Sequence, residues 1–230
     1  MGYAIPAWEL PTVAVAGSED RFPVHRIYCV GRNYAEHVKE MGHNPERDAP
    51  FFFTKPADAV VADGSMIPFP MNTENLHHEI ELVVALGKDG IRIAKQQALD
   101  HVFGYAVGLD LTRRDRQGEA KKAGRPWDTG KAFDRAAPCA AIHPVSVVGH
   151  PSQGAITLSV NGEVRQQGEL TELIWSVPEV ISILSESFEL KAGDLIFTGT
   201  PAGVGPLQRG DRIEGAIEGL GTLGIALSSD

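Results

Sequence analysis

Short apolar runs separated by glycine-rich turns constrain the fold of this chain more than any other feature. Residues 155–168, AITLSVNGEVRQQG, alternate polar and apolar side chains around Asn161-Gly162, which predicts a β-hairpin closed by a type I′ turn. From residue 193 onward the chain continues as short strands broken by glycine. Helical patterns are fewer and do not alternate regularly with the strands. We therefore predict a β-rich α+β fold and disfavour a doubly wound sheet or a TIM barrel.

The rest of the chain supplies further strands and a simple domain plan. Apolar runs predict strands over 26–31 and 51–56, and we interpret the proline-rich residues 1–25 as an N-terminal lead-in. No composition shift or linker interrupts residues 26–230, which predicts that they form a single domain.

Start and stop signals predict three helices. The first covers 32–42 and ends at a glycine. The second begins at Thr112, where Asp115 completes a capping-box pattern, and ends near residue 124. The third covers 176–188, with Ser176 as its N-cap and a glutamate three residues later.

Charge and composition narrow the partners. The formal net charge of −9 argues against a nucleic acid or an anionic membrane, although a local basic pocket can still bind an anionic substrate. No apolar run reaches the roughly 18 residues of a spanning helix, and the N-terminus lacks the basic start of a signal peptide. We expect a cytoplasmic protein in which Cys29 and Cys139 are reduced thiols.

Two carboxylates open an apolar run at residues 76–87, LHHEIELVVALG. Side chains alternate along a strand, so we expect His77, Glu79 and Glu81 to share one face. Like charges on one face repel unless a cation lies between them. The motif alone is equally compatible with a metal site and with a solvent-exposed strand face.

A third carboxylate favours the metal site. Asp110 ends the strand FGYAVGLDLT, and its face otherwise carries Gly108, Ala106 and Gly104. Such a face either leaves room beside the carboxylate or accommodates a closely packed strand. Three carboxylates offer hard oxygen ligands that suit Mg²⁺ or Mn²⁺ better than Zn²⁺, although His77 or His78 keeps zinc open as an alternative.

Five segments, in this order and spacing, resemble the fumarylacetoacetate hydrolase family. They are CVGRNYAEHVKEMG, HHEIEL, GYAVGLDLTRRDRQ, GRPWDTGKAFD and IFTGTPAGVGP, and the resemblance extends from about residue 26 to the end. It implies a mixed β-roll fold, a homodimer, and Mg²⁺ or Mn²⁺ held by a Glu-x-Glu pair and an aspartate. Glu79, Glu81 and Asp110 occupy those positions.

The resemblance also implies a lid helix carrying a His–Glu dyad, which here is His37 and Glu40. The two are three residues apart on the predicted helix, so they share one face. An imidazole oriented by a carboxylate can take a proton from water. The alternative is a solvated pair on a surface helix.

Further site residues follow from the same motifs. Lys131 matches the family's active-site lysine, Arg114 and Gln117 match the polar pair after the metal-binding aspartate, and Thr200 matches the threonine of a glycine-rich substrate loop. Lys55 is a weaker candidate for a substrate carboxylate. The loop lacks the GK[ST] of a phosphate-binding loop, which excludes that reading.

The resemblance implies a metal-dependent hydrolase that cleaves the C–C bond of an acylpyruvate, a small 2,4-dioxo acid. Within the family, the sequence most resembles members that act on fumarylpyruvate, so we expect this compound to be the substrate, with fumarate and pyruvate as the products. In the implied reaction the carboxylate and 2-oxo group of the substrate chelate the metal, and cleavage leaves a pyruvate enolate. Two enzymatic alternatives use the same chelation and an enolate: decarboxylation of oxaloacetate and isomerisation of 2-hydroxyhepta-2,4-diene-1,7-dioate. A metal-stabilised binding protein without turnover is the non-enzymatic alternative.

Overall fold

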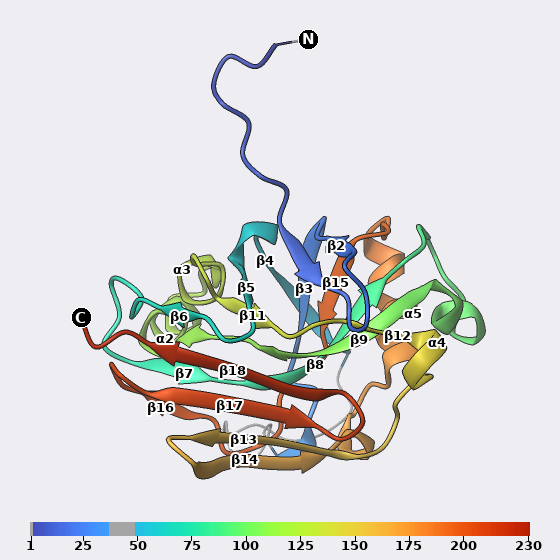
Figure 1. Ribbon diagram of the computed structural model, residues 1–230. Coiled ribbons are helices and arrows are strands. Elements are labelled where there is room, and N and C mark those ends of the chain that lie inside the picture. Colours follow the sequence, from blue (N-terminus) through green and yellow to red (C-terminus); the bar gives the residue numbers. More distant parts are fainter. Residues whose placement is uncertain (1, 37–48) are drawn as a thin grey trace.

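A computed structural model describes residues 2–36 and 49–230, and its strands form four sheets within those ranges (Figure 1). The largest sheet has the order β4-β3-β15-β8-β9-β11-β5, and β12 also pairs with β9. Its strands are β3 (Arg26–Gly31), β4 (Phe51–Lys55), β5 (Val60–Ala62), β8 (Ile80–Leu86), β9 (Val102–Leu109), β11 (Ala137–Cys139), β12 (His143–Pro144) and β15 (Asp194–Phe197). The β15–β3 and β11–β5 pairs are parallel and the others are antiparallel, so the sheet is mixed.

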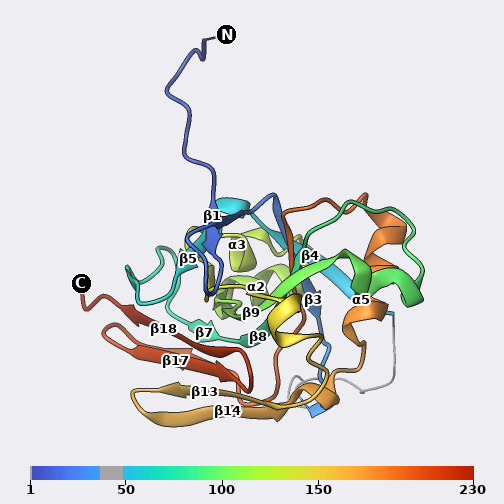
Figure 2. The same ribbon diagram turned by 45° about the vertical axis from the view of Figure 1, so that its right-hand side comes forward.

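A five-stranded sheet with the order β14-β13-β17-β18-β6 packs against the large one (Figures 1 and 2). Its strands are β6 (Met66–Ile67), β13 (Ala155–Val160), β14 (Glu163–Glu169), β17 (Arg212–Ile217) and β18 (Gly221–Leu227). Asn161 and Gly162 both have positive φ, 53° and 82°, as a type I′ turn requires, which confirms the predicted hairpin. The β-rich α+β fold with a curled mixed sheet is also confirmed.

One apolar core joins the two sheets. Ile80, Leu82 and Val107 of the large sheet lie in the same buried cluster as Ile156 and Ile213 of the smaller one. Gly215 of β17 lets the sheets approach, since a Cβ there would come within 2.8 Å of Ile80 Cδ1. The core therefore fixes the position of β8, which begins just after Glu79 and contains Glu81, and of β9, which ends just before Asp110.

The run 76–87 is two strands rather than one. β7 (Leu76–His78) belongs to a separate three-stranded sheet with β10 (Thr112–Arg113) and β16 (Gly205–Leu207), and β8 starts only at Ile80. Glu79 lies in the break, where its carbonyl accepts the Asp110 N–H at 2.9 Å. The start of β8 and the end of β9 therefore lie side by side at one end of the large sheet, which brings Glu79 and Asp110 together.

The glycines of β9 serve close packing. A Cβ at Gly104 would overlap the backbone of His143 in β12, and one at Gly108 would lie 2.8 Å from the Phe197 ring. At Gly104 and Gly108 the structure supports the packed neighbour as the reason for small residues, whereas the predicted room beside Asp110 is present as a pocket that this residue lines.

The helices begin where their caps allow. The α-helices are α2 (Arg114–Lys122), α3 (Asp128–Lys131), α4 (Val145–Val148) and α5 (Val177–Ser187), and the 3-10 helices are η1 (Ala57–Ala59), η2 (Lys95–His101) and η3 (Leu170–Glu172). The cap of α5 is confirmed, because Glu179 Oε2 accepts hydrogen bonds from Ser176 N at 3.0 Å and from Ser176 Oγ at 2.7 Å.

The predicted capping box at Thr112 is wrong. Thr112 lies in β10, where its hydroxyl donates to the Asp110 carbonyl at 3.1 Å, and the helix begins two residues later. Asp115 instead accepts hydrogen bonds from the Thr73 hydroxyl at 2.7 Å and from Glu74 N at 3.0 Å. Of the predicted helix 32–42, residues 32–34 are not helical and residues 35 and 36 are. Residues 37–42, which make up the rest of the proposed lid, lie outside the described residues.

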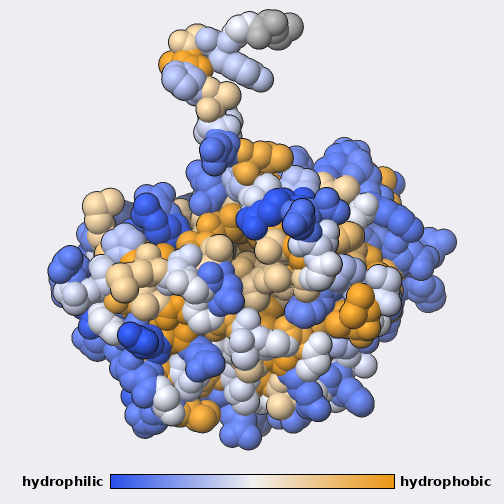
Figure 3. Space-filling view, viewed as in Figure 1, coloured by the Kyte–Doolittle hydropathy of each residue, from blue (hydrophilic) through white to orange (hydrophobic). Residues whose placement is uncertain are grey.

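The N-terminal lead-in is partly structured. β1 (Thr12–Ala14) and β2 (Arg21–Pro23) pair with each other, and Val13 and Phe22 join a second buried cluster behind β3 and β15. Residues before β1 extend away from the body and expose large apolar side chains: Tyr3, Ile5, Trp8 and Leu10 (Figures 1 and 3). Among the described residues, no helix is long and apolar enough to cross a membrane.

Candidate active site

Three buried carboxylates meet where the large sheet ends. Glu79 comes from the break between β7 and β8, Glu81 from β8, and Asp110 from the end of β9. Each offers an oxygen atom, and these oxygens all lie within 4.8 Å of one another. The structure therefore brings together the three residues that the sequence proposed as metal ligands.

Three cationic side chains contact these carboxylates within the described residues. Lys131 Nζ lies 2.8 Å from Glu79 Oε2 and 2.6 Å from Asp110 Oδ2, and it also donates to the Thr112 hydroxyl at 2.6 Å. Lys55 Nζ lies 2.7 Å from Asp110 Oδ1, and Arg114 pairs with Glu79. The three positive charges of these side chains balance the three negative charges of the carboxylates.

Burial and mutual repulsion make the negative charge of the cluster unfavourable, which favours binding of a further cation. Burial, followed by the charges of Asp110 and Glu79, raises the pKa of Glu81 well above its ordinary value. Burial alone would lower the pKa of Lys131, but the charges of Asp110 and Glu79 outweigh it and raise that pKa. A divalent ion would relieve the repulsion at Glu81, and hard carboxylate oxygens fit Mg²⁺ or Mn²⁺.

The two neighbouring histidines have other partners. His77 interacts through both ring nitrogens, with Asn75 Oδ1 at 2.9 Å and with Arg114 Nε at 3.3 Å. Burial, and then the charge of Arg114, lowers its pKa to about 4. His78 Nδ1 lies 2.9 Å from Gln166 Oε1. Neither histidine belongs to the acidic cluster, which disfavours the zinc alternative.

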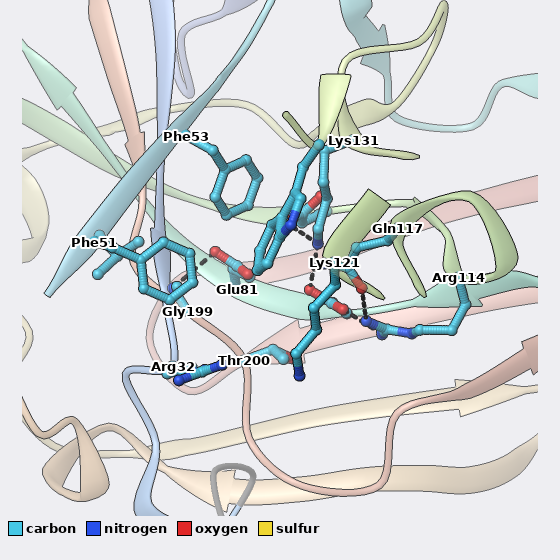
Figure 4. Close-up of a pocket in the computed structure, with 15 residues that line it drawn as sticks. Arg32, Phe51, Phe53, Glu81, Arg114, Gln117, Lys121, Lys131, Gly199 and Thr200 are labelled. Carbon is cyan, nitrogen blue, oxygen red and sulfur yellow. Dashed lines mark hydrogen bonds and ion pairs between the residues drawn. The ribbon is translucent and has the colours of Figure 1, made fainter. Parts of the chain in front are cut away.

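A pocket opens onto the carboxylates (Figure 4). Its lining includes Lys131 of α3, with Arg114 and Gln117 of α2, and the Arg114 guanidinium donates to Gln117 Oε1 at 2.7 Å. Other lining residues are Val30, Gly31, Arg32, Phe51, Phe53, Lys121, Trp127, Gly199 and Thr200. One end of the pocket is therefore charged and is built from Glu79, Glu81, Asp110 and the cations paired with them. One wall is aromatic and is built from Phe51, Phe53 and Trp127.

The substrate-loop threonine is held firmly at this pocket. Thr200 Oγ1 accepts a hydrogen bond from Gln166 Nε2 at 2.8 Å, and the same amide group donates to the Pro201 carbonyl at 2.9 Å. Gly199 N donates to Glu81 Oε2 at 2.8 Å, so the loop also orients a carboxylate. Gln166 was missed by the sequence analysis, because a glutamine in an alternating hairpin strand gives no signal of burial.

The remaining predicted residues fall in two groups. Lys55 is buried behind Asp110, where its ammonium also donates to the Leu111 carbonyl at 3.1 Å, and it is not among the lining residues. His37 and Glu40 lie outside the described residues, so the proposed dyad stays a prediction.

The aromatic wall depends on a glycine. A Cβ at Gly31 would overlap the Phe51 ring, which packs edge to face on Trp127 with ring centroids 5.2 Å apart. We expect Gly31→Ala to displace Phe51 and to lower the free energy of unfolding by about 1–3 kcal/mol, as overpacking does. Urea denaturation measures the change. Gly118→Ala is the matched control, because the space around Gly118 in α2 is open and alanine favours a helix. Equal stability of the two variants would contradict the overlap.

Comparison with known proteins decides the family. The family described as Fumarylacetoacetate (FAA) hydrolase C-terminal matches residues 26–227. The chain belongs to the fumarylacetoacetate hydrolase family. As a member of this family it is an enzyme, and it carries a buried Glu-Glu-Asp cluster suited to a divalent metal.

Relatives in the fumarylacetoacetate hydrolase family include enzymes with two different names. The solved structure of fumarylpyruvate hydrolase from Pseudomonas aeruginosa, in complex with Mn²⁺ and pyruvate, is 53% identical, with a TM-score of 0.96 and full coverage of both chains. Fumarylpyruvate hydrolase from Ralstonia sp is 45% identical over 177 residues, 77% of this chain and 92% of that protein. Oxaloacetate tautomerase FAHD1, mitochondrial, from Mus musculus is 46% identical over 194 residues, 84% of this chain and 87% of that protein.

Proposed function

We propose that this protein is a metal-dependent acylpyruvate hydrolase whose main substrate is fumarylpyruvate. The observation that carries the proposal is the buried Glu79–Glu81–Asp110 cluster, which shares a pocket with Lys131 and Arg114. The 53% identity to a fumarylpyruvate hydrolase that binds Mn²⁺ and pyruvate supports it over the full length of the chain.

The charge of the site favours an anionic substrate. Lys55, Lys131 and Arg114 already balance the three carboxylates, so a divalent ion adds net positive charge to the site. When bound by Glu79, Glu81 and Asp110, the ion supplies Lewis-acid stabilisation to a 2-oxo acid. An acylpyruvate carries a carboxylate and gains an enolate charge during cleavage, so its charge complements this site.

The protein's own groups have separate roles in the proposed reaction. Lys131 lies between Glu79 and Asp110, where its ammonium stabilises the negative charge that develops on the pyruvate enolate oxygen. Arg114 and Gln117 lie side by side on one face of α2 and bind the pyruvyl carboxylate. Thr200 borders the substrate from the opposite loop.

Hydrolysis further requires an activated water. His37, oriented by Glu40, takes a proton from water as the oxygen attacks the C4 carbonyl. The C3–C4 bond then breaks, its electron pair forms the pyruvate enolate, and protonation at C3 gives pyruvate. The acyl group leaves as a carboxylate, which is fumarate when fumarylpyruvate is the substrate.

A second candidate is an activity on oxaloacetate, favoured by the 46% identity to oxaloacetate tautomerase FAHD1. Decarboxylation and tautomerisation of oxaloacetate use the same chelation and enolate but need no attacking water. The diene-dioate isomerase remains a further candidate for the same reason.

Metal removal tests the proposal. We expect the chelated protein to lose hydrolysis of fumarylpyruvate, followed as loss of the enolised dioxo acid's absorbance, and to regain it with Mg²⁺ or Mn²⁺. We also expect circular dichroism to show a folded chain after chelation, because Lys131 and Lys55 keep the carboxylates paired. Full hydrolysis by the metal-free protein would contradict the proposal. Turnover of oxaloacetate but not of fumarylpyruvate would favour the second candidate.

Three further predictions accompany the proposed function. Residues 26–230 act as the single catalytic domain, the protein works as a homodimer, and it is located in the cytoplasm. The exposed apolar segment around Ile5 and Trp8 supports an association between chains. Sedimentation of the purified protein at several concentrations tests the homodimer.

A further inference from the structure

Two further cationic side chains, Arg32 and Lys121, line the pocket. Arg32 follows β3, and Lys121 lies one turn beyond Gln117 on α2. Both residues line the pocket and both are exposed, so they lie at its mouth, whereas Glu79, Glu81 and Asp110 are buried at its base. Figure 4 shows Arg32 and Lys121 on the same side of Glu81, away from the backbone of Lys131.

Arg32 is held in an unusual conformation. Its φ of 60° lies in the left-handed region, which costs energy for any residue with a Cβ and is found preferentially at functional sites. Its guanidinium lies 5.6 Å from the centroid of the Phe51 ring, close enough for a cation–π interaction. Phe51 is itself positioned over Gly31, so the end of β3 and the start of β4 fix the Arg32 side chain at the pocket.

An aromatic surface connects the base of the pocket to its mouth. Phe51 packs edge to face on Trp127, and Phe53 lies 5.9 Å from Trp127, ring centroid to ring centroid. All three rings line the pocket. A flat, unsaturated acyl chain can lie against such a wall, whereas its charged end cannot remain there without a cation.

We propose that Arg32 and Lys121 form a second anion-binding subsite, which takes the distal carboxylate of a 2-oxo dicarboxylic acid. We call these two residues the distal subsite. The inference rests on the proposed function for the orientation of the ligand, with its 2-oxo acid end at the metal ligands. It adds that the protein selects acyl groups that end in a carboxylate over neutral acyl groups.

Other basic residues near the motifs do not meet the requirements of such a subsite. Lys55 is buried and paired with Asp110, so it cannot reach a ligand at the mouth. Arg125 follows α2 but is not among the lining residues. Arg114 and Lys131 contact the carboxylates at the base.

A pair of uncleavable ligands tests the distal subsite without turnover. 2-Oxoheptanedioate has the chain length and both carboxylates of fumarylpyruvate but lacks the 4-oxo group and the double bond, and 2-oxoheptanoate is the same saturated chain ending in a methyl group. We expect the Mn²⁺-loaded protein to bind the dioate about tenfold more tightly by calorimetry, the order expected of two exposed charge contacts. Equal affinity for the two ligands would overturn the inference.

Variants identify the residues responsible. We expect Lys121→Met to reduce the affinity ratio severalfold and Arg32→Gln/Lys121→Met to bring it close to one. Lys122→Met is the matched control, because Lys122 is the next exposed lysine on α2 but does not line the pocket. A ratio that survives in the double variant, or that falls equally in the control, would overturn the assignment. If the ratio behaves as expected but fumarylpyruvate is not cleaved, the proposed function fails and the distal subsite stands.

Discussion

Replacing Asp110 with asparagine is expected to abolish metal binding and to destabilise the protein at the same time. Asp110 is fully buried, and each of its two carboxylate oxygens lies within 2.7 Å of a lysine ammonium, from Lys55 and from Lys131. The variant keeps the shape of the side chain but leaves these buried ammonium groups short of a counter-charge. Removing one partner of a buried ion pair typically costs about 3–5 kcal/mol of unfolding free energy. We therefore expect Asp110→Asn to lose hydrolysis, to bind no Mn²⁺ by calorimetry, and to unfold at lower urea concentration.

A surface ion pair provides the control. Glu119 pairs with Arg116 at 3.0 Å on the exposed side of α2, and exposed pairs of this kind are worth about 0–1 kcal/mol. We expect Glu119→Gln to keep both stability and Mn²⁺ binding. An Asp110→Asn protein that still binds Mn²⁺ with the affinity of the parent would contradict the assignment of Asp110 as a ligand.

Replacing His37 with alanine should separate hydrolysis from chemistry that needs no attacking water. A positioned general base contributes about 10²–10⁴-fold to rate, so His37→Ala should reduce hydrolysis of fumarylpyruvate by that factor. Decarboxylation of oxaloacetate, if present, should fall much less. Lys131→Ala should reduce both reactions, since both pass through an enolate and Lys131 lies beside the carboxylates that would hold the ion.

One substrate panel measures both variants. His101→Ala is the control for the loss of an imidazole, because His101 ends η2 and is not among the residues that line the pocket. Unchanged cleavage of fumarylpyruvate by His37→Ala would show that another group activates the water. If Lys131→Ala spares either reaction, the role of Lys131 in enolate stabilisation is wrong, whatever the family.

The periodic parts of the fold were accessible from the sequence because they are local. Alternation around Asn161-Gly162 and the cap at Ser176 each depend on a few neighbouring residues, and the structure confirms both. The three carboxylates could also be identified, because charge at the edge of an apolar run is visible in one dimension. Lys131 and Thr200 came from resemblance, since a single lysine or threonine carries no such local signal.

The parts that were missed depend on contacts between distant segments. The break at Glu79 is set by pairing of β7 with β10 and β16, which no local pattern encodes. Thr112 was assigned to a cap because its spacing to Asp115 fits one, yet β-pairing with His77 holds it in a strand. Gln166 and the aromatic wall of Phe51 and Trp127 likewise become site residues only when separate strands and helices meet.

The balanced charges around the carboxylates also link metal loading to the supply of substrate. Lys55, Lys131 and Arg114 already compensate the charge of the three carboxylates, so an ion that enters raises the net positive charge of the site. An anionic substrate offsets the charge that the ion brings, and each ligand must then increase the affinity for the other by the same factor. If the substrate is the dioxo acid of the proposed function, we expect occupancy by the metal to rise as that acid accumulates and to fall as it is consumed. Under the proposed function, the fraction of active enzyme then depends on the concentration of the substrate as well as on that of the metal.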